Sequence, residues 1–324
     1  MNEREKFMRA MVITRFGTTD VFAERDMKKP SAGVGELLVR VEASGTNPVE
    51  AKIRKHGHWA AIEPPAVLGY DVSGVVEQIG EGISDFKVGD EVYYTPEIYK
   101  NQLGSYAEYN VVKASIAAHK PKSLSHVEAA AVPLAGGTAW EAIVRRLRVS
   151  VGETILIHGG AGGVGSFAVQ VARAAGCRVI ATAGSANQDT LKNLGVDLPV
   201  DYSKQDWKQV CLEATDSQGV DAVFDTVGGE LITESLSITK PFGNLAGILG
   251  FRGDLTEAYR KNLTLHGVFL VRERKRLQQM AIAIDQGKIK PLVDKVLPLE
   301  QVAKAHERLD SGHGRGKIVL KIRD

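Results

Sequence analysis

The chain has 324 residues, which is enough for two domains of ordinary size with a large hydrophobic core. It carries 41 Lys and Arg against 39 Asp and Glu, a net charge of +2, and 44% of its residues are hydrophobic. Near-neutral charge argues against nucleic acid as the main partner, and the apolar content excludes a disordered chain. Glycine is the anomaly, because the chain contains 34 of them, above the usual level of about 7%.

Two cysteines, Cys177 and Cys211, are too few for a disulfide scaffold or a Cys-rich zinc site. The start of the chain carries mixed charges and lacks the apolar core of a signal peptide. The longest apolar runs, such as residues 129–134, are too short to cross a bilayer. These features predict a reduced, cytoplasmic protein without a membrane partner.

The first 125 or so residues are predicted to be rich in β-structure. Residues 36–42 alternate polar and apolar side chains, as a half-buried strand does. Two further strands are expected at 72–79 and 91–94, bounded by glycine turns. Short strands at such close spacing indicate a small barrel or sandwich.

The pattern changes near His126, where helical spacing begins and continues over residues 138–147. Strands and helices then alternate, which predicts a parallel sheet covered by helices on both faces. The expected strands are 154–158, 178–182, 220–225, 244–249 and 263–270, and the expected helices are 164–175 and 189–194. Helices at about 274–286 and 300–309 and a strand at 317–322 close the chain.

The excess glycine becomes informative between the strand 154–158 and the helix 164–175. Gly160, Gly162 and Gly165 form a G-x-G-x-x-G pattern, with Gly163 and Val164 between them. Small residues let the backbone approach a pyrophosphate, and the following helix presents its amides and positive end to the charge. Since a strand precedes this loop and a helix follows it, the loop predicts a dinucleotide site. The alternative is a tight turn in another doubly wound fold.

The second strand of this unit is expected to end in Thr182–Gln188, which contains no carboxylate. A site for NAD usually has Asp or Glu there to bind the ribose 2′-hydroxyl, whereas a 2′-phosphate would be repelled by an acid. The sequence therefore favours NADP(H). Ser185, Gln188 and Tyr202 are the expected neighbours of the phosphate, although each is also an ordinary loop residue.

Several motifs, in this order, resemble the medium-chain dehydrogenase/reductases, in particular their zinc-free quinone oxidoreductase (zeta-crystallin-like) branch. They cover nearly the whole chain: residues 43–48, 68–76, 86–90, 104–108, 133–140, the glycine loop, 224–228 and 316–320. The resemblance implies an α/β fold with a Rossmann doubly wound parallel sheet and a GroES-like β-barrel domain. It places the GroES-like catalytic domain at 1–127 and 273–324 and the Rossmann domain at 128–272, with the active site in the cleft between them.

Zinc alcohol dehydrogenases of this family carry a Cys where this chain has Thr46 or Asn47, and Gly-His-Glu where it has residues 69–71. Both cysteines of this chain lie elsewhere, so no metal is expected. His56 and His58 are the one metal-like pair, and they are interpreted as surface histidines.

Without a Lewis acid, oxidising an unactivated alcohol is difficult, because nothing stabilises the alkoxide. Reducing a quinone or a conjugated carbonyl needs only a hydrogen-bond donor near the developing enolate. Asn47 is the candidate polar anchor, or else a turn-capping residue before Pro48. Tyr70 is a candidate donor, as is Tyr106, and the role of Glu50 stays open. His56 and Trp59 lie in the loop that lines the family's substrate pocket.

The resemblance also implies cofactor contacts. Thr138 approaches the nicotinamide ribose, the loop with Leu249 and Phe251 and the backbone near Phe269 line the nicotinamide, and Arg315 reaches the adenosine phosphate. Arg315 is alternatively a solvated side chain in a glycine-rich turn. A homodimer is expected through the strand at 263–270.

The leading hypothesis is an NADPH-dependent oxidoreductase that transfers hydride to a quinone or an α,β-unsaturated carbonyl without zinc. Two alternatives stay open, a metal-free ketone or alcohol oxidoreductase and a cofactor-binding protein with a structural or regulatory role.

Overall fold

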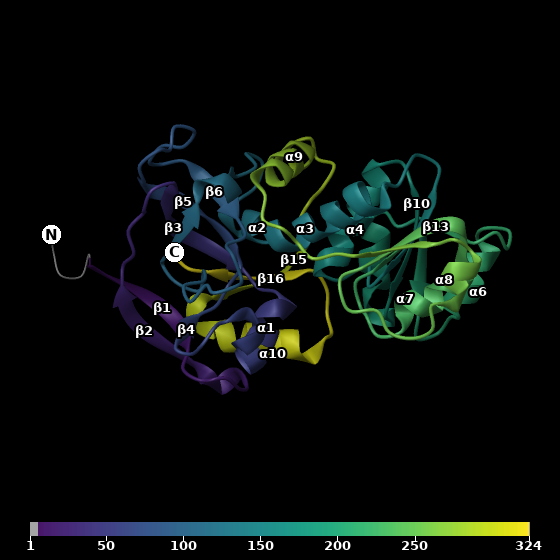
Figure 1. The fold of residues 1–324 in the computed structure, drawn as a ribbon, viewed down its shortest axis with the longest axis horizontal. Coiled ribbons are helices and arrows are strands. Elements are labelled where there is room, and N and C mark those ends of the chain that lie inside the picture. Colours follow the sequence, from purple (N-terminus) through teal and green to yellow (C-terminus); the bar gives the residue numbers. More distant parts are fainter. Residues whose placement is uncertain (1–5, 324) are drawn as a thin grey trace.

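The computed structural model describes residues 6–323, which form two α/β bodies side by side (Figure 1). The second body is built on a six-stranded parallel sheet with the strand order β11-β10-β9-β12-β13-β14. Numbered within this unit, that order is 3-2-1-4-5-6, the order of a dinucleotide-binding doubly wound sheet. Its strands are β9 (Thr154–His158), β10 (Arg178–Ala183), β11 (Leu198–Asp201), β12 (Val220–Asp225), β13 (Thr239–Gly247) and β14 (Thr264–Gly267).

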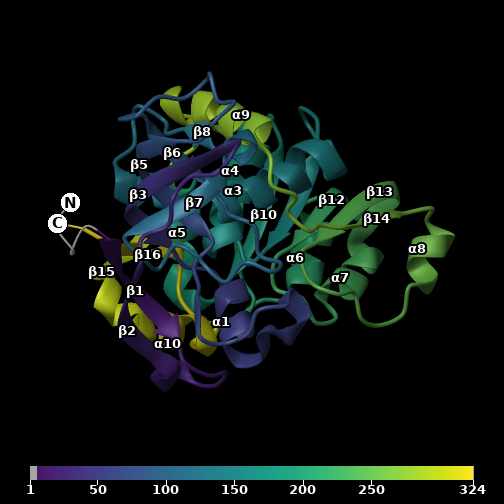
Figure 2. The same ribbon diagram turned by 60° about the vertical axis from the view of Figure 1, so that its left-hand side comes forward.

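Both faces of this sheet are buried, and for that reason its strands are apolar throughout. Along β9, Ile155 and Ile157 point to the face covered by α4 (Gly163–Ala174), whereas Leu156 joins the core beneath α6 (Trp207–Glu213) and α7 (Leu231–Glu234). Two shorter helices, α5 (Gln188–Asn193) and α8 (Thr256–Arg260), complete this body. Figure 2 shows α8 projecting beyond β14, on the side away from the first body.

The first body contains a seven-stranded sheet with the order β15-β16-β3-β5-β6-β8, in which β7 also pairs with β3. The bounds are β3 (Glu36–Gly45), β5 (Asp71–Ile79), β6 (Glu91–Tyr94), β7 (Tyr109–Lys113), β8 (Ala118–His119), β15 (Val293–Pro298) and β16 (Lys317–Lys321). A smaller sheet has the order β2-β1-β4, with β1 (Phe7–Ile13), β2 (Phe22–Lys28) and β4 (Ala66–Val67). The C-terminal strands β15 and β16 therefore join the same sheet as strands from the first third of the chain.

Five helices surround the junction of the two bodies. They are α1 (Pro48–His56), α2 (His126–Ala130), α3 (Pro133–Trp140), α9 (Arg274–Asp285) and α10 (Val302–Ser311). Helix α3 packs against α4 of the second body and against α9, and α1 packs against α10. In Figure 1, α2 and α3 lie between the sheet of the first body and that of the second.

The predicted fold class, a Rossmann sheet with a GroES-like β-domain, is confirmed. The domain limits at 127/128 and 272/273 stay a prediction. Several elements differ from expectation, among them the strand expected at 244–249, which is β13 and begins at Thr239. The helix expected at 138–147 is α3 followed by a π-helical segment, Glu141–Leu147. The strand expected at 263–270 ends at Gly267, so that residues 268–270 leave the sheet. Within residues 6–323, no helix is long and apolar enough to span a membrane.

Candidate active site

A cavity of about 1210 Å³ runs between the two bodies. The glycine loop and the ends of β10, β12 and β13 line one side, and the start of α1 and the turn before β16 line the other. The carboxyl ends of parallel strands therefore open into it, as they do at the ligand sites of doubly wound sheets.

The glycine loop connects β9 to α4 and packs closely against itself. A Cβ on Gly165 would lie 2.1 Å from the carbonyl oxygen of Gly159, and one on Gly160 would lie 2.8 Å from Ala181 Cβ. Gly162 caps the N-terminus of α4, and Gly162, Gly163 and Val164 line the cleft. The two outer glycines thus permit the tight turn, and the middle of the loop presents backbone to a ligand at a helix N-terminus.

A second turn, residues 312–316, lies against the glycine loop. The backbone amide of Gly316 donates to the carbonyl oxygen of Ala161 at 2.8 Å, and the side-chain Nδ2 of Asn187 donates to the carbonyl oxygen of Gly314 at 3.2 Å. Residue 317 therefore begins its strand directly beside the expected pyrophosphate position. A Cβ on Gly163 would lie 3.1 Å from Lys317 Cδ.

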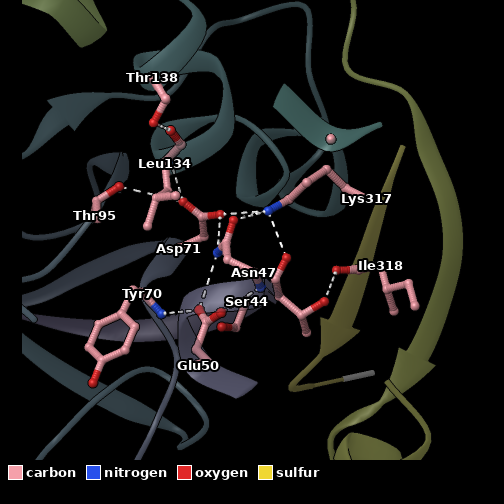
Figure 3. Close-up of polar contacts among 12 residues, drawn as sticks. Ser44, Asn47, Glu50, Tyr70, Asp71, Thr95, Leu134, Thr138, Lys317 and Ile318 are labelled. Carbon is pink, nitrogen blue, oxygen red and sulfur yellow. Dashed lines mark hydrogen bonds and ion pairs between the residues drawn. The ribbon is translucent and has the colours of Figure 1, made fainter. Parts of the chain in front are cut away.

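Lys317 is the centre of a buried polar cluster at the floor of the cleft (Figure 3). Its ammonium donates to the carbonyl oxygen of Thr46 at 2.7 Å, to Asp71 Oδ2 at 3.1 Å and to Asn47 Oδ1. Lys317 is 4% exposed and Asp71 is fully buried. Asp71 Oδ1 also accepts from the amide of Leu134 at 2.6 Å. A buried charge pair of this kind is tolerated when the protons of the ammonium and the oxygens of the carboxylate all have hydrogen-bond partners.

Asn47 has no proton left to donate. It caps the N-terminus of α1 in a capping box with Glu50. Its Nδ2 donates to Glu50 Oε1 at 3.1 Å and to Asp71 Oδ2 at 2.9 Å, while its Oδ1 accepts from Lys317. The candidate anchor lines the cleft, but this network holds both its amide protons.

Glu50 is fully buried and accepts from three N–H groups, among them the backbone amides of Asn47 at 2.5 Å and Tyr70 at 3.0 Å. Burial raises the pKa of Glu50 to about 8, and the nearby Lys317 ammonium offsets only part of that effect. The carboxyl therefore carries a proton over much of the neutral range.

The other end of the cleft is apolar and aromatic. Trp59 and Phe269 line it, and Tyr99 joins them, with ring centroids 5.9 Å from Trp59 and 6.1 Å from Phe269. Trp59 comes from the first body and Phe269 from the segment that leaves β14. Leu249 and Thr138 line the cleft between this end and the glycine loop, with the Thr138 hydroxyl donating to Leu134 O at 2.7 Å.

Polar and basic side chains line the opposite end. Ser185 and Tyr202 are among them, and the Ser185 hydroxyl donates to Asp201 Oδ2 at 2.5 Å. Arg315 pairs with Asp294 at 2.9 Å, and Arg308 approaches the same carboxylate at 3.6 Å. Two arginines share one acid, so this rim keeps a positive charge.

The remaining predicted residues lie outside the lining of the cleft. Gln188 donates hydrogen bonds from its side-chain amide to the carbonyl oxygens of Ala183 and Val200, and Phe251 is partly buried and packs against the core beneath α7. Tyr106 is fully buried with its hydroxyl 3.2 Å from His306 Nε2. The ring of Tyr70 is fully buried and points away from Lys317 (Figure 3).

Sequence reasoning missed Asp71 and Lys317, which form the polar cluster, and Arg272, which lines the cleft. Asp71 and Lys317 stand inside motifs used for the resemblance, and a lysine at the start of a buried strand is a signal that could have been followed. Arg272 carried no signal, because its place depends on where the chain leaves β14.

The residues at the expected metal position do not suit zinc. Zinc in proteins takes Cys, His or carboxylate ligands, whereas an amide and a lysine ammonium stand beside Asp71. No cluster of three or more His, Cys, Asp or Glu within residues 6–323 has a geometry that could hold a metal ion.

Comparisons with known proteins agree with this architecture. An alcohol dehydrogenase GroES-like domain matches residues 33–122, and a zinc-binding dehydrogenase domain matches residues 194–320. The NADPH-dependent alkenal/one oxidoreductase of Arabidopsis thaliana, described as chloroplastic, is 34% identical, covering 97% of this chain and 80% of that protein. Human quinone oxidoreductase is 31% identical, with coverage of 98% and 99%.

Among solved structures, an alcohol dehydrogenase superfamily protein from Novosphingobium aromaticivorans matches with a TM-score of 0.91 and 33% identity, covering 98% of this chain and all of that one. Fold, cleft and relatives together define a pyridine-nucleotide-dependent oxidoreductase. The chain belongs to the medium-chain dehydrogenase/reductase family, in its quinone oxidoreductase branch. The predicted family and the predicted enzymatic nature are confirmed.

Proposed function

We propose that this protein is an NADPH-dependent oxidoreductase that transfers hydride to a quinone or an α,β-unsaturated carbonyl compound without zinc. The observation that carries the proposal is the Lys317 ammonium, held by Asn47 and Asp71 at the floor of the cleft. These three side chains satisfy one another and leave no set of ligands for a Lewis acid. Alcohol oxidation would then lack alkoxide stabilisation, whereas conjugate reduction requires only a donor for the enolate oxygen.

The glycine loop suits the diphosphate of a dinucleotide. A side chain at Gly165 would overlap the backbone of Gly159, so the glycines allow a tight turn that leads directly into the N-terminus of α4. Backbone amides at the start of α4 bind the phosphates, and Thr138, Leu249 and Phe269 enclose the path toward the aromatic end. A bound reduced nicotinamide supplies the hydride. Lys317 holds Asn47 and Asp71 in one arrangement beside that path.

NADPH is preferred over NADH in this proposal. Ser185 and Tyr202 line the adenosine end, and the charge that Arg308 and Arg315 leave unbalanced at Asp294 suits a 2′-phosphate. The name of the Arabidopsis relative supports the same choice.

The aromatic end supports a flat, conjugated acceptor. Trp59 and Phe269 are 46% and 56% exposed and line the cleft on opposite bodies, so that a planar substrate would cover apolar ring surface on both sides. The printed names of the relatives, a quinone and an alkenal/one oxidoreductase, agree with this chemistry.

An acceptor panel tests the reaction. We expect purified protein to oxidise NADPH, followed by loss of its absorbance, with a quinone and with an enone but slowly with a simple ketone. Dialysis against a chelator should leave the rates unchanged. No oxidation with any acceptor would overturn the proposal, and activity with simple alcohols that the chelator abolishes would overturn its zinc-free part.

A binding experiment tests the cofactor preference separately. Arg315→Gln removes one rim charge, and we expect its Kd for NADPH to rise about fivefold to tenfold while its Kd for NADH stays constant. Arg252→Gln, an exposed arginine outside the cleft, is the matched control and should change neither. Tighter binding of NADH than of NADPH by the unmodified protein would contradict the assignment.

We also propose a homodimer formed through β14, which lies at the edge of its sheet and offers an unpaired strand side. Light scattering after size-exclusion chromatography checks this, since a monomer mass of about 35 kDa would oppose it. Two free cysteines support a cytoplasmic location, which cell fractionation tests.

A further inference from the structure

The cleft between the two bodies is lined by positive side chains. Its lysines and arginines are Lys52, Arg272, Arg308, Arg315 and Lys317. Among the described residues that line it, none is Asp or Glu, although the chain has nearly as many acidic as basic residues, 39 against 41. A cleft lined by one sign of charge favours ligands, and developing charges, of the opposite sign.

Lys52 differs from the other four cations, because they already have partners. Lys317 and the two arginines of the rim are paired with carboxylates, and Arg272 donates to two backbone carbonyl oxygens. Lys52 is exposed, and no hydrogen bond or ion pair joins it to any residue in the part of the chain that the structure describes. Its ammonium therefore keeps three protons for a ligand in the cleft.

The place of Lys52 on α1 directs it toward the substrate end. Asn47 caps this helix, and Pro48, Val49 and Lys52 line the cleft, whereas residues of the opposite face are buried. Residues three and four apart lie on one side of a helix. At 1.5 Å per residue, Lys52 stands about 7.5 Å along the helix axis from Asn47. The long, flexible stem of a lysine lets its ammonium reach the space beside the polar floor.

The reaction proposed above needs a donor for the carbonyl oxygen of the acceptor, and the donors expected from sequence are already used or buried. Both amide protons of Asn47 are bound to carboxylates, and the Thr138 hydroxyl donates to a backbone carbonyl oxygen. Tyr70 and Tyr106 are fully buried and do not line the cleft. Lys52 is a charged donor on the same wall that is both free and accessible.

We propose that the Lys52 ammonium donates a hydrogen bond to the carbonyl oxygen of the acceptor and stabilises the negative charge that develops there during hydride addition. This inference rests on the function proposed above and names the donor which that function requires. Trp59 lies in the turn that follows α1 and also lines the cleft. One short segment of the first body therefore supplies an aromatic surface for a conjugated acceptor and a cation for its oxygen.

The electrons and atoms balance for an enone. Its β-carbon receives a hydride, with the electron pair, from the reduced cofactor and forms a C–H bond. The carbon–carbon π pair moves toward the carbonyl carbon, and the carbonyl π pair moves to oxygen, which gives an enolate. Lys52 keeps its proton and donates a hydrogen bond to the enolate oxygen. Water then protonates the α-carbon, so that the products are the saturated ketone, the oxidised cofactor and hydroxide.

Two variants test the role of Lys52. Lys52→Met keeps the length of the stem but removes the charge and the protons, whereas Lys52→Arg keeps both. We expect kcat/KM for the enone to fall roughly 10-fold to 100-fold in Lys52→Met, the range for losing one hydrogen bond to a charged group. Lys52→Arg should recover most of that loss. The Kd for NADPH should not change in either variant.

A series of aryl enones gives a readout that a structural role would not move. Electron-withdrawing substituents on the aryl ring should accelerate Lys52→Met more steeply than the unmodified protein, because the enolate oxygen of the variant must bear its charge without a cation. Equal slopes of the logarithm of kcat against the substituent constant would overturn the inference.

Lys55→Met is the matched control. Lys55 is exposed on the same helix, lies outside the lining of the cleft and pairs with Asp310 at 2.8 Å, which keeps Arg54 as its other partner. The variant removes the same charge from the same helix, so it separates a contact with the acceptor from a general loss of positive charge. We expect its kcat/KM to stay unchanged, and equal losses in Lys52→Met and Lys55→Met would oppose the assignment.

The remaining outcomes separate this inference from the proposed function. If the unmodified protein reduces the enone and Lys52→Met does so within about threefold of it, less than one charged hydrogen bond is worth, the inference is overturned and the proposed function stands. A raised Kd for NADPH with unchanged kcat would make Lys52 a cofactor contact and would also overturn it. If the unmodified protein reduces no enone or quinone, the proposed function fails, and the inference fails with it. If Lys52→Met does not fold, Lys52→Gln replaces it under the same criteria.

Discussion

Replacing Lys317 with methionine keeps the length of the side chain but removes the ammonium from the floor of the cleft. The carboxylate of Asp71, which is fully buried, then loses its cation, and the oxygens of Thr46 and Asn47 lose a donor. Removing one partner of a buried ion pair costs about 3–5 kcal/mol. We expect the free energy of unfolding to fall by that amount, since no solvent reaches Asp71 to compensate.

Urea unfolding followed by both circular dichroism and tryptophan fluorescence measures this change, with coincident transitions required for a single free energy. Lys295→Met is the matched control, because Lys295 is exposed on the neighbouring strand β15, and it should cost less than about 0.5 kcal/mol. In the double variant Lys317→Met/Asp71→Asn, neither charge remains, so the loss should be smaller than the sum of the two single losses. A loss in Lys317→Met no larger than in the control would refute the reasoning about the buried pair.

Two further predictions concern the glycine loop and Glu50. In Gly165→Ala the new Cβ would lie 2.1 Å from Gly159 O, so the loop must shift and the Kd for NADPH should rise at least tenfold. Gly267→Ala, which meets nothing within 4 Å, should bind normally, and equal affinities in both variants would contradict the assignment. Glu50 has a folded-state pKa of about 8 against an ordinary 4.5, so the folded state binds an extra proton between these values. Stability should therefore fall as pH rises through that window, by up to about 5 kcal/mol. Glu50→Gln should remove that slope from urea midpoints measured between pH 5 and 8, and an unchanged slope would oppose the shift.

The sequence predicted the elements around the proposed cofactor site well, because their signals are local. The strand at 154–158, the glycines after it and the helix that follows lie within 22 residues of each other, and periodicity together with glycine spacing identifies them. Helix α9 was expected at 274–286 and is found at Arg274–Asp285. In such elements the spacing of apolar residues along the local sequence already shows which face of the helix or strand will be buried.

The substrate end was predicted less well, because its contacts join distant parts of the chain. Lys317 meets Asn47 across 270 positions, and Arg272 meets Pro96 across 176. No local pattern indicates which polar groups such a contact will satisfy. Asn47 lines the cleft, and only the fold shows that both its side-chain amide protons are bound. Tyr70 was selected for its hydroxyl, and only the fold shows that its ring is fully buried just before β5.

The sequence alone determined the fold class, the family, the glycine loop and the absence of a cysteine ligand set near residues 46–47, since each depends on residue types in a local order. Only the tertiary structure decided that an ammonium stands beside Asp71 and that Asn47 has no proton to spare. The physical reason is that hydrogen-bond satisfaction is a property of neighbours in space. A donor is free or used according to what the fold places around it.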